Sequence, residues 1–388
     1  MKPIRLLSIL LFFSACGSNG RDLPQGVEII SVEYENATKD ATSFLEKIEI
    51  IPLETNDSSV ISYSAKAIYD RVMDMYAFYF RDQVVYTFSG DGTYIANSKK
   101  MKGKGPKEYY MALDIQFNPY LKGIDLLNPY GTVYTYSPTF ELIAKRNYKQ
   151  EFPVNKFMPL DSVNYLFTYP DMWTDQEVSF ENIETHQKVN TTFQGTIGSN
   201  NMSRSCFYKR GSNFDFVPFG LNYYLYQIDK QKKELLPVAY LDFGDAEVRN
   251  EDLPGLSTGK RTKDDAELSA ISKGLQERYQ FLFNSTEVIP EIKLFNKDYV
   301  YVFMVKTTMP GRTFLYNRQT KKGFLLNDGI PFDMFLCFDI VDNILLSLCP
   351  PHEISHFVDR RFMSAEEICK MERLKEDDNP VIIKYYLK

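Results

Sequence analysis

The alternation of apolar and polar residues predicts a series of β-hairpins in this chain. The stretch "VVYTFSGDGTYIAN" (Val84–Asn97) can be placed over "TVYTYSPTFELIAK" (Thr132–Lys145), with Val-Tyr-Thr-aromatic-Ser and then Ile-Ala at the same offsets. In each stretch an alternating run is followed by a polar turn and a returning run, which is the pattern of a hairpin. Weaker copies follow at Glu181–Val189, Tyr224–Leu236 and Thr313–Leu326.

A hairpin that recurs roughly every 45 residues is typical of a β-propeller, in which each blade is a four-stranded sheet. A second pair of strands accompanies the hairpins, for example "LDIQFN" with "GIDLLN" and "EIKLFN" with "YVYVFMV". Stacking such blades around an axis buries the apolar faces that a single hairpin leaves exposed. A β-sandwich with an accidental repeat is the alternative fold.

The two ends of the chain are expected to share a sixth blade. Lys47–Glu54 has the pattern of a strand without an early partner, Asn379–Lys388 has that of a final strand, and Met334–Cys349 has that of a hairpin. Pairing the first strand with the last closes the ring and removes its open edge. The sequence therefore predicts an all-β, six-bladed β-propeller over residues 46–388, closed by its N- and C-terminal strands and carrying a few peripheral helices.

Two helical segments are expected to interrupt the strands. A charged insertion at about residues 245–283 carries apolar residues at helical spacing, namely Leu268, Ile271, Leu275, Tyr279 and Leu282. We expect this helix to brace the ring, and a lid over one face is the alternative. A second helical segment is expected at about residues 351–376, where Ser364 and Glu367 form a capping-box pattern.

The first residues predict export and lipidation. Lys2 and Arg5 precede the apolar run Leu6–Phe13, which is too short to span a bilayer. The run ends in Phe13-Ser14-Ala15-Cys16, and small residues before a cysteine resemble the lipobox of bacterial lipoproteins. We expect residues 1–16 to be a signal peptide with lipidation at Cys16, residues 17–45 to be a linker, and the lipid to hold the protein on a membrane. An ordinary signal peptide or a buried N-terminal helix is the alternative.

Composition narrows the classes of partner. The chain has 388 residues, of which 44% are apolar and 15% aromatic, and this suits a large β-rich core. The net charge of −6 and the lack of a strongly basic block argue against a nucleic-acid partner. Cys206, Cys337, Cys349 and Cys369 match no zinc-ribbon or CxxC spacing. We expect free buried thiols, with a Cys337–Cys349 disulfide across a hairpin as the alternative.

Several motifs together resemble those of the six-bladed β-propeller lipoproteins of Bacteroides-type bacteria. They are the lipobox, "GKGPKEY" (Gly103–Tyr109), "LDFGD" (Leu241–Asp245) and the ending "LKEDDNPVIIKYYLK" (Leu374–Lys388). The resemblance covers most of the mature chain. It implies the propeller fold and a place in the cell envelope, at the outer membrane on its periplasmic or surface face. It implies no activity, so no catalytic residue is transferred from it.

One stretch carries a candidate for enzymatic chemistry. "PPHEISHFVDRR" (Pro350–Arg361) contains His352-Glu353-x-x-His356, the pattern in which two histidines bind zinc and the glutamate is the general base. The glycine and third histidine of the longer metzincin pattern are absent, so a third ligand would come from Glu366, Glu367 or Glu372. The alternative, which we favour, is a short amphipathic helix that packs Ile354 and Phe357 on the propeller without a metal or other cofactor.

The remaining motifs give little indication of a binding site. Lys102–Tyr109 is no phosphate loop, because Pro106 follows Gly105 and no Ser or Thr follows a Gly-Lys pair; we expect an inter-blade turn whose glycines adopt positive φ. Trp173 lies in a loop among acidic residues. We expect its side chain to be a structural anchor, and stacking on a sugar or a peptide is the alternative.

The sequence shows no Ser-His-Asp set and no nucleophile elbow. It leaves open whether the protein is an enzyme and favours a ligand-binding or protein-interaction module, whose partner is an unidentified protein or glycan. A zinc hydrolase built on His352, Glu353 and His356, and a propeller lyase or hydrolase acting on glycans, are the alternatives.

Overall fold

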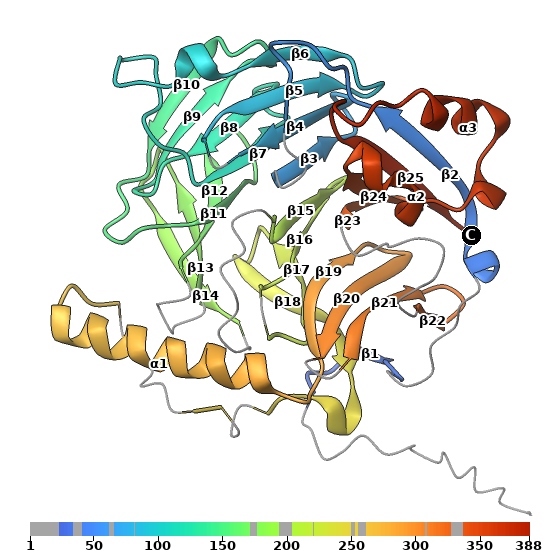
Figure 1. The fold of residues 1–388 in the computed structure, drawn as a ribbon. Helices are drawn as coiled ribbons and strands as arrows, with labels where there is room; N and C mark the ends of the chain where they lie inside the picture. The colour runs from blue at the N-terminus through green and yellow to red at the C-terminus, as the bar shows by residue number, and fades with distance from the viewer. Residues whose placement is uncertain are drawn as a thin grey trace, which may run out of the picture.

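The computed structural model describes residues 23–33, 41–61, 66–80, 82–170, 177–193, 204–219, 221–249, 253–254, 261–306, 309–326 and 337–388. Their strands form six small sheets arranged around a common axis (Figure 1). The six-bladed β-propeller expected from the sequence is confirmed, with few helices at its periphery.

The blades follow one another along the chain, each with its innermost strand first. Blade 1 contains β3–β6 (Lys66–Asp70, Met75–Tyr79, Val85–Ser89, Tyr94–Asn97), and blade 2 contains β7–β10 (Asp114–Asn118, Gly123–Leu127, Thr132–Tyr136, Leu142–Asn147). Blade 3 contains β11–β14 (Lys156–Pro159, Asn164–Thr168, Glu177–Asn182, Lys188–Thr192), and blade 4 contains β15–β18 (Phe207–Arg210, Asn213–Phe216, Tyr224–Asp229, Glu234–Asp242). Blade 5 contains β19–β22 (Ile289–Phe295, Tyr299–Lys306, Met309–Asn317, Lys322–Leu326).

Blade 6 is assembled from both ends of the chain, as the sequence predicted. It contains β23 (Cys337–Val341), β24 (Ile344–Cys349), β25 (Val381–Leu387) and β2 (Leu45–Pro52). β2 and β25 pair antiparallel, with Ile50 opposite Ile383. This pairing joins the N-terminal part of the propeller to its C-terminus and leaves no unpaired edge between them.

The two most similar hairpins share one register. Thr87 pairs with Ala96 in blade 1, Thr135 pairs with Ala144 in blade 2, and an irregularity follows each pair toward the turn. The turns are built alike in several blades, because an Asn or Asp side chain accepts the backbone N–H groups two and three residues later. Asn182, Asp229 and Asn317 do so in blades 3, 4 and 5.

The core lies between neighbouring blades. Ala77 and Val85 of blade 1 pack with Ile115 and Leu126 of blade 2, and all four are fully buried. On its other side, blade 1 packs against blade 6 through a second cluster that contains Phe78, Phe88, Leu346 and Ile382. Each blade therefore buries both faces, which is how short sheets that expose their backbone edges become stable.

Part of the segment expected to be a linker forms a strand. β1 (Glu28–Ser31) pairs parallel with β18, Glu28 opposite Ala239, and becomes a fifth strand at the outer edge of blade 4. Its Ile30 is buried in the main core cluster. Four residues carry too little alternation to be recognised as a strand from sequence.

The insertion contains a long helix, as its apolar spacing predicted. α1 (Asp265–Asn284) begins after Asp264, whose side chain accepts the N–H groups of Ala266 and Glu267. Ile271 and Leu275 of the expected stripe are buried. A short 3₁₀ helix (Gly244–Ala246) precedes the insertion. No residue of α1 lines the central cavity described below.

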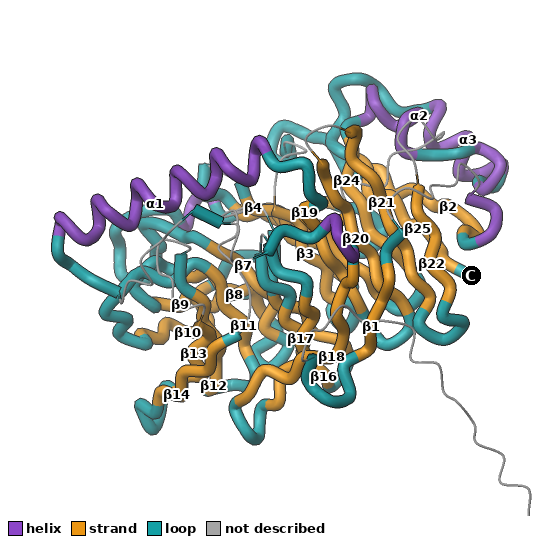
Figure 2. The backbone as a smooth tube through the Cα atoms, turned by 90° about the horizontal axis from the view of Figure 1, so that it is seen from below, coloured by secondary structure: helices purple, strands orange, loops and turns teal. Residues whose placement is uncertain are grey.

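The C-terminal helices lie on the opposite side of the ring from α1 in both views (Figures 1 and 2). A 3₁₀ turn (Pro351–Glu353) leads into α2 (Ile354–Phe357), and α3 (Ala365–Glu372) packs beside β2. The Ser364 hydroxyl accepts the N–H of Glu367, as the capping pattern predicted. Shorter 3₁₀ helices occur at Ala41–Ser43, Lys99–Met101 and Arg360–Phe362. None of the described helices has the length and apolarity needed to span a bilayer.

Candidate functional site

A cavity of about 890 Å³ lies at the centre of the ring. Its wall receives an apolar residue from the innermost strand of every blade: Ile68, Phe117, Met158, Phe207, Phe295 and Phe338. Its volume is within the range of sites that bind small molecules, roughly 300–1,000 Å³. Because all six blades contribute, the cavity is a consequence of closing the ring rather than of any one segment.

A buried arginine joins three blades at this wall. The Nη2 atom of Arg210, at the end of β15, lies 2.6 Å from Oδ1 of Asp339 on β23. Its Nε atom lies 3.9 Å from Oδ2 of Asp215 on β16 and donates to the carbonyl oxygen of Phe295 on β19 at 3.5 Å. The guanidinium also lies over the ring of Tyr208, 4.9 Å from its centroid. One side chain thereby contacts blades 4, 5 and 6.

Asp215 is a buried acidic group of this cluster. Its side chain lines the cavity and is only 3% exposed. Burial raises the pKa of the Asp215 carboxyl to about 7, and Asp339 acts in the same direction, while Arg210 and Arg318 act against them. A carboxyl group that titrates near neutral pH inside a cavity is suited to proton-linked binding or to acid–base chemistry.

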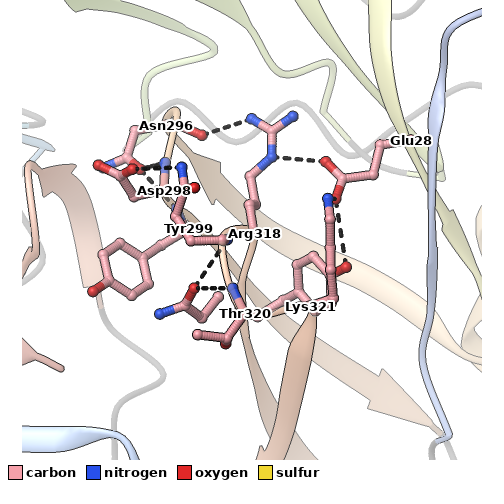
Figure 3. A network of polar contacts seen from close by, with 10 residues as sticks. Glu28, Asn296, Asp298, Tyr299, Arg318, Thr320 and Lys321 are labelled. Atoms are coloured by element: carbon pink, nitrogen blue, oxygen red, sulfur yellow. Dashed lines mark hydrogen bonds and ion pairs between the residues drawn. The ribbon is translucent and has the colours of Figure 1, made fainter.

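The outer part of the cavity wall is held by Glu28 from β1 (Figure 3). Its carboxylate accepts from Arg318 Nε at 2.8 Å and from Lys321 Nζ at 2.5 Å. Both basic residues lie in the turn between β21 and β22, and Arg318 also donates to the carbonyl oxygen of Asn296 at 2.8 Å. These contacts outweigh the effect of burial and lower the pKa of Glu28. The strand added to blade 4 is therefore tied to blade 5.

A second charged cluster lies at the other ends of the innermost strands, among blades 1, 2 and 3. Lys66, Asp114 and Lys156 are the first residues of β3, β7 and β11, and each is at most 1% exposed. Oδ1 of Asp114 lies 2.5 Å from Lys66 Nζ and 3.4 Å from Lys156 Nζ. Burial lowers the pKa of Lys66 to about 8, although Asp114 acts in the opposite direction.

The zinc-peptidase pattern lies at the surface, away from this cavity. His352 and Glu353 belong to a 3₁₀ turn, His356 lies in the single turn of α2, and all three side chains are exposed. His352 Nε2 lies 3.6 Å from Glu353 Oε1. In the part of the chain that the structure describes, no three His, Cys, Asp or Glu side chains are grouped closely enough to hold a metal ion.

The neighbours of this pattern have structural partners. Ile354 and Phe357 are buried in the main core cluster, as the alternative interpretation expected. Glu367, one of the residues considered as a third ligand, is buried instead, where it accepts from the N–H of Ile50 at 2.6 Å and from Lys370. Glu366 contacts Lys370, and Glu372 contacts Arg360.

The glycine-rich turn corrects one expectation. Residues Lys102–Tyr109 do connect blades 1 and 2, but neither Gly103 nor Gly105 has a positive φ. The Glu108 side chain folds over them and accepts the N–H of Gly105 at 2.8 Å. A Cβ atom on Gly103 would lie 2.0 Å from the Glu108 carboxylate. The backbone conformation therefore does not require glycine at either position, and the nearest neighbour of a Cβ atom there is the flexible end of the Glu108 side chain.

Other sequence candidates have simpler outcomes. Cys206, Cys337 and Cys349 are free and buried, and Cys369 is free and exposed, so the alternative of a Cys337–Cys349 disulfide is not realised. Cys16 and Trp173 lie outside the described residues.

Sequence reasoning missed the residues that define the cavity. None of the residues Arg210, Asp215 and Asp339 belongs to a motif. The first two lie on neighbouring strands of blade 4, and Asp339 lies in blade 6, far away in the sequence. For the second charged cluster, by contrast, one signal was available: a charged residue begins the innermost strand in three successive blades, at Lys66, Asp114 and Lys156. Aligning the innermost strands, rather than the outer hairpins, would have revealed it.

Comparison with known proteins places the chain in a family without a defined activity. The family described as "Domain of unknown function (DUF4934)" matches residues 27–386. A Bacteroides fragilis protein described as a "Putative exported protein" has a similar fold, with a TM-score of 0.68 and 16% identity over 93% of this chain and 99% of that chain. The β-propeller domain of Cps50 (Swd1) from Myceliophteria thermophila gives a TM-score of 0.41 and 9% identity, over 88% of this chain and 100% of that chain. No match was found among curated protein sequences. Because the family match spans nearly all of the propeller, this chain belongs to the DUF4934 family.

Proposed function

We propose that this protein is an exported, lipid-anchored β-propeller that binds a ligand in its central cavity. The observation that carries the proposal is the cavity of about 890 Å³, walled by all six blades. Apolar and aromatic residues from every blade line the cavity, and they are interspersed with many charged residues, among them Arg210, Asp215 and Asp339. In sites that bind small molecules, apolar wall residues supply affinity and polar groups fix the orientation of the ligand.

Ligand-observed NMR with a fragment library tests this proposal on the mature chain. Asn213 is the exposed first residue of β16 and lines the cavity, so Asn213→Trp should narrow the entrance without disturbing the core. Asn190→Trp, on the exposed outer strand β14, is the matched control. We expect fragments that bind the wild type and the control but not Asn213→Trp. Fragments that bind all three proteins equally would place binding elsewhere and contradict the proposal.

Export and anchoring rest on the N-terminal pattern. The basic residues, the apolar run and the small residues before Cys16 occur in the order of a lipoprotein signal. The fold-related Bacteroides fragilis protein is itself described as exported. Metabolic labelling with a radioactive fatty acid is the test. We expect the wild type to incorporate label and to sediment with membranes, and Cys16→Ser to do neither. Labelling of Cys16→Ser would contradict lipidation at this residue.

A further inference from the structure

The Arg210 guanidinium has donor capacity that the protein does not use. The side chain is 14% exposed and lines the cavity. Its Nη2 atom contacts Asp339 and its Nε atom contacts Phe295 and, at longer range, Asp215. Among the described residues, the buried Nη2 atom forms an ion pair with Asp339 but has no hydrogen-bond partner. A guanidinium presents its N–H groups as a planar fork that matches the two oxygens of a carboxylate.

The charges around Asp215 restrict what can bind beside it. Arg210 on β15, Arg318 in the turn between β21 and β22, and Asp339 on β23 are the charged groups that act on this carboxyl. Tyr208 and Gln227 are its neutral partners across the strands. Two carboxyl groups thus already lie beside Arg210. An incoming anion would meet like charge unless one of them became neutral, and Asp215 is the more deeply buried of the two.

We propose that the cavity binds the carboxylate of a small organic acid at Arg210, and that Asp215 takes up one proton from solvent as the acid binds. The inference rests on the proposed ligand-binding function and names the chemistry of the ligand. Protonated Asp215 is neutral, so it removes a repulsive charge and offers an O–H donor to the bound carboxylate. The apolar residues contributed by the six blades leave room for an apolar or ring-shaped body.

The same carboxylate group can come from an acidic oligosaccharide or from the C-terminus of a short peptide. Two matched pairs of probes separate the group from its source: trigalacturonate with its methyl ester, and Gly-Gly-Phe with its C-terminal amide. Within each pair the body is nearly constant and only the charge is removed. Isothermal titration calorimetry on the mature chain, at pH 6 and pH 8 and in buffers of different ionisation heat, measures affinity and proton uptake together.

We expect at least one acid to bind at least tenfold more tightly than its neutral counterpart. The affinity of this acid should be about tenfold lower at pH 8 than at pH 6. At pH 8 the Asp215 carboxyl must be protonated as the acid binds, whereas at pH 6 most of it already is. Heats measured in the two buffers at pH 8 should correspond to uptake of about one proton. Binding of neither acid, or equal binding of acid and neutral counterpart, would overturn the inference. If the acid and its neutral counterpart bind equally and Asn213→Trp abolishes the binding of both, the proposed ligand-binding function would still hold.

Variants assign the effect to the two residues. Asp215→Asn resembles the protonated form, so acid binding should no longer change between pH 6 and pH 8 and proton uptake should disappear. Asp377→Asn, at an exposed carboxylate, should behave as the wild type. Arg210→Lys keeps the positive charge but loses the planar fork, and should weaken acid binding about tenfold, with thermal unfolding checked in parallel. Persistent proton uptake in Asp215→Asn would exclude Asp215 as the acceptor.

Discussion

Arg210 of blade 4 contacts Asp339 of blade 6 at the wall of the central cavity, with 2.6 Å between Nη2 and Oδ1. Its contact with Phe295 brings blade 5 into the same cluster. At the other ends of the innermost strands, Asp114 joins Lys66 and Lys156 and thereby connects blades 1, 2 and 3. The ring is thus held by outer strand pairing in blade 6 and by two charged clusters near its axis.

The second charged cluster, which joins blades 1, 2 and 3, should lose stability when its carboxylate is removed. Asp114→Asn keeps the shape of the side chain but removes the carboxylate that both lysine ammonium groups contact. Leaving buried charge without its counter-charge typically costs about 3–5 kcal/mol. We expect a loss of that size in the free energy of unfolding, measured by urea denaturation.

The double variant Lys66→Met/Asp114→Leu removes one charge of each sign from the same cluster. It should be less destabilised than Asp114→Asn, because a pair replaced by apolar groups leaves less buried charge uncompensated. Equal stability of Asp114→Asn and the wild type would show that this cluster contributes nothing to holding the blades.

Asp215 should make stability depend on pH. Its pKa in the folded protein is about 7, raised from an ordinary value of 3.8, so the folded state holds a proton that the unfolded state has released between these values. Stability should therefore fall as pH rises from about 4 to 7, by up to ~1.4 kcal/mol per pH unit. In Asp215→Asn this contribution should vanish, and the variant should be more stable than the wild type at pH 8. Urea denaturation at pH 5 and pH 8 measures both; an unchanged pH dependence in the variant would contradict the assignment.

Gly92 should be required where the turn of blade 1 meets blade 6. Its φ is +90°, and a Cβ atom there would lie 2.4 Å from the backbone oxygen of Pro52. Gly92→Ala should therefore lower the free energy of unfolding by about 2 kcal/mol or more, through backbone strain and a clash. Gly26→Ala is the matched control, since Gly26 has a φ of +88° but no atom within 4 Å of its Cβ position. Similar losses in both variants would mean that strain alone, and not contact between blades, requires Gly92.

The exposed histidine pattern should not bind metal with structural or catalytic consequence. Only a single helical turn carries His356, and His352 lies beside Glu353 at the surface. We expect mass spectrometry of the purified mature chain to find less than one zinc per chain, and His352→Ala to unfold at the wild-type temperature. One zinc per chain that is lost in His352→Ala would make this surface a metal site.

The outer architecture was predictable because each blade repeats one local pattern. The hairpins of blades 1 and 2 share their register as well as their residues, so the repeat was visible in the chain at Val84–Asn97 and Thr132–Lys145. The closing pair β2 and β25 followed from two strand patterns without local partners. The cavity was not predictable in this way, because Arg210 and Asp339 meet only when the ring closes. β1 was missed because a four-residue edge strand has little pattern of its own.

A crystallographic soak of the mature chain with a fragment library is the most direct test of ligand binding at the centre of the ring. We expect bound fragments in the cavity walled by all six blades, with acidic fragments placing a carboxylate oxygen within hydrogen-bonding distance of Arg210. Asn213→Trp crystals soaked in the same way should lack them. Fragments found only outside the cavity, or none at concentrations that saturate other small-molecule sites, would contradict the view that this propeller binds its ligand at its centre.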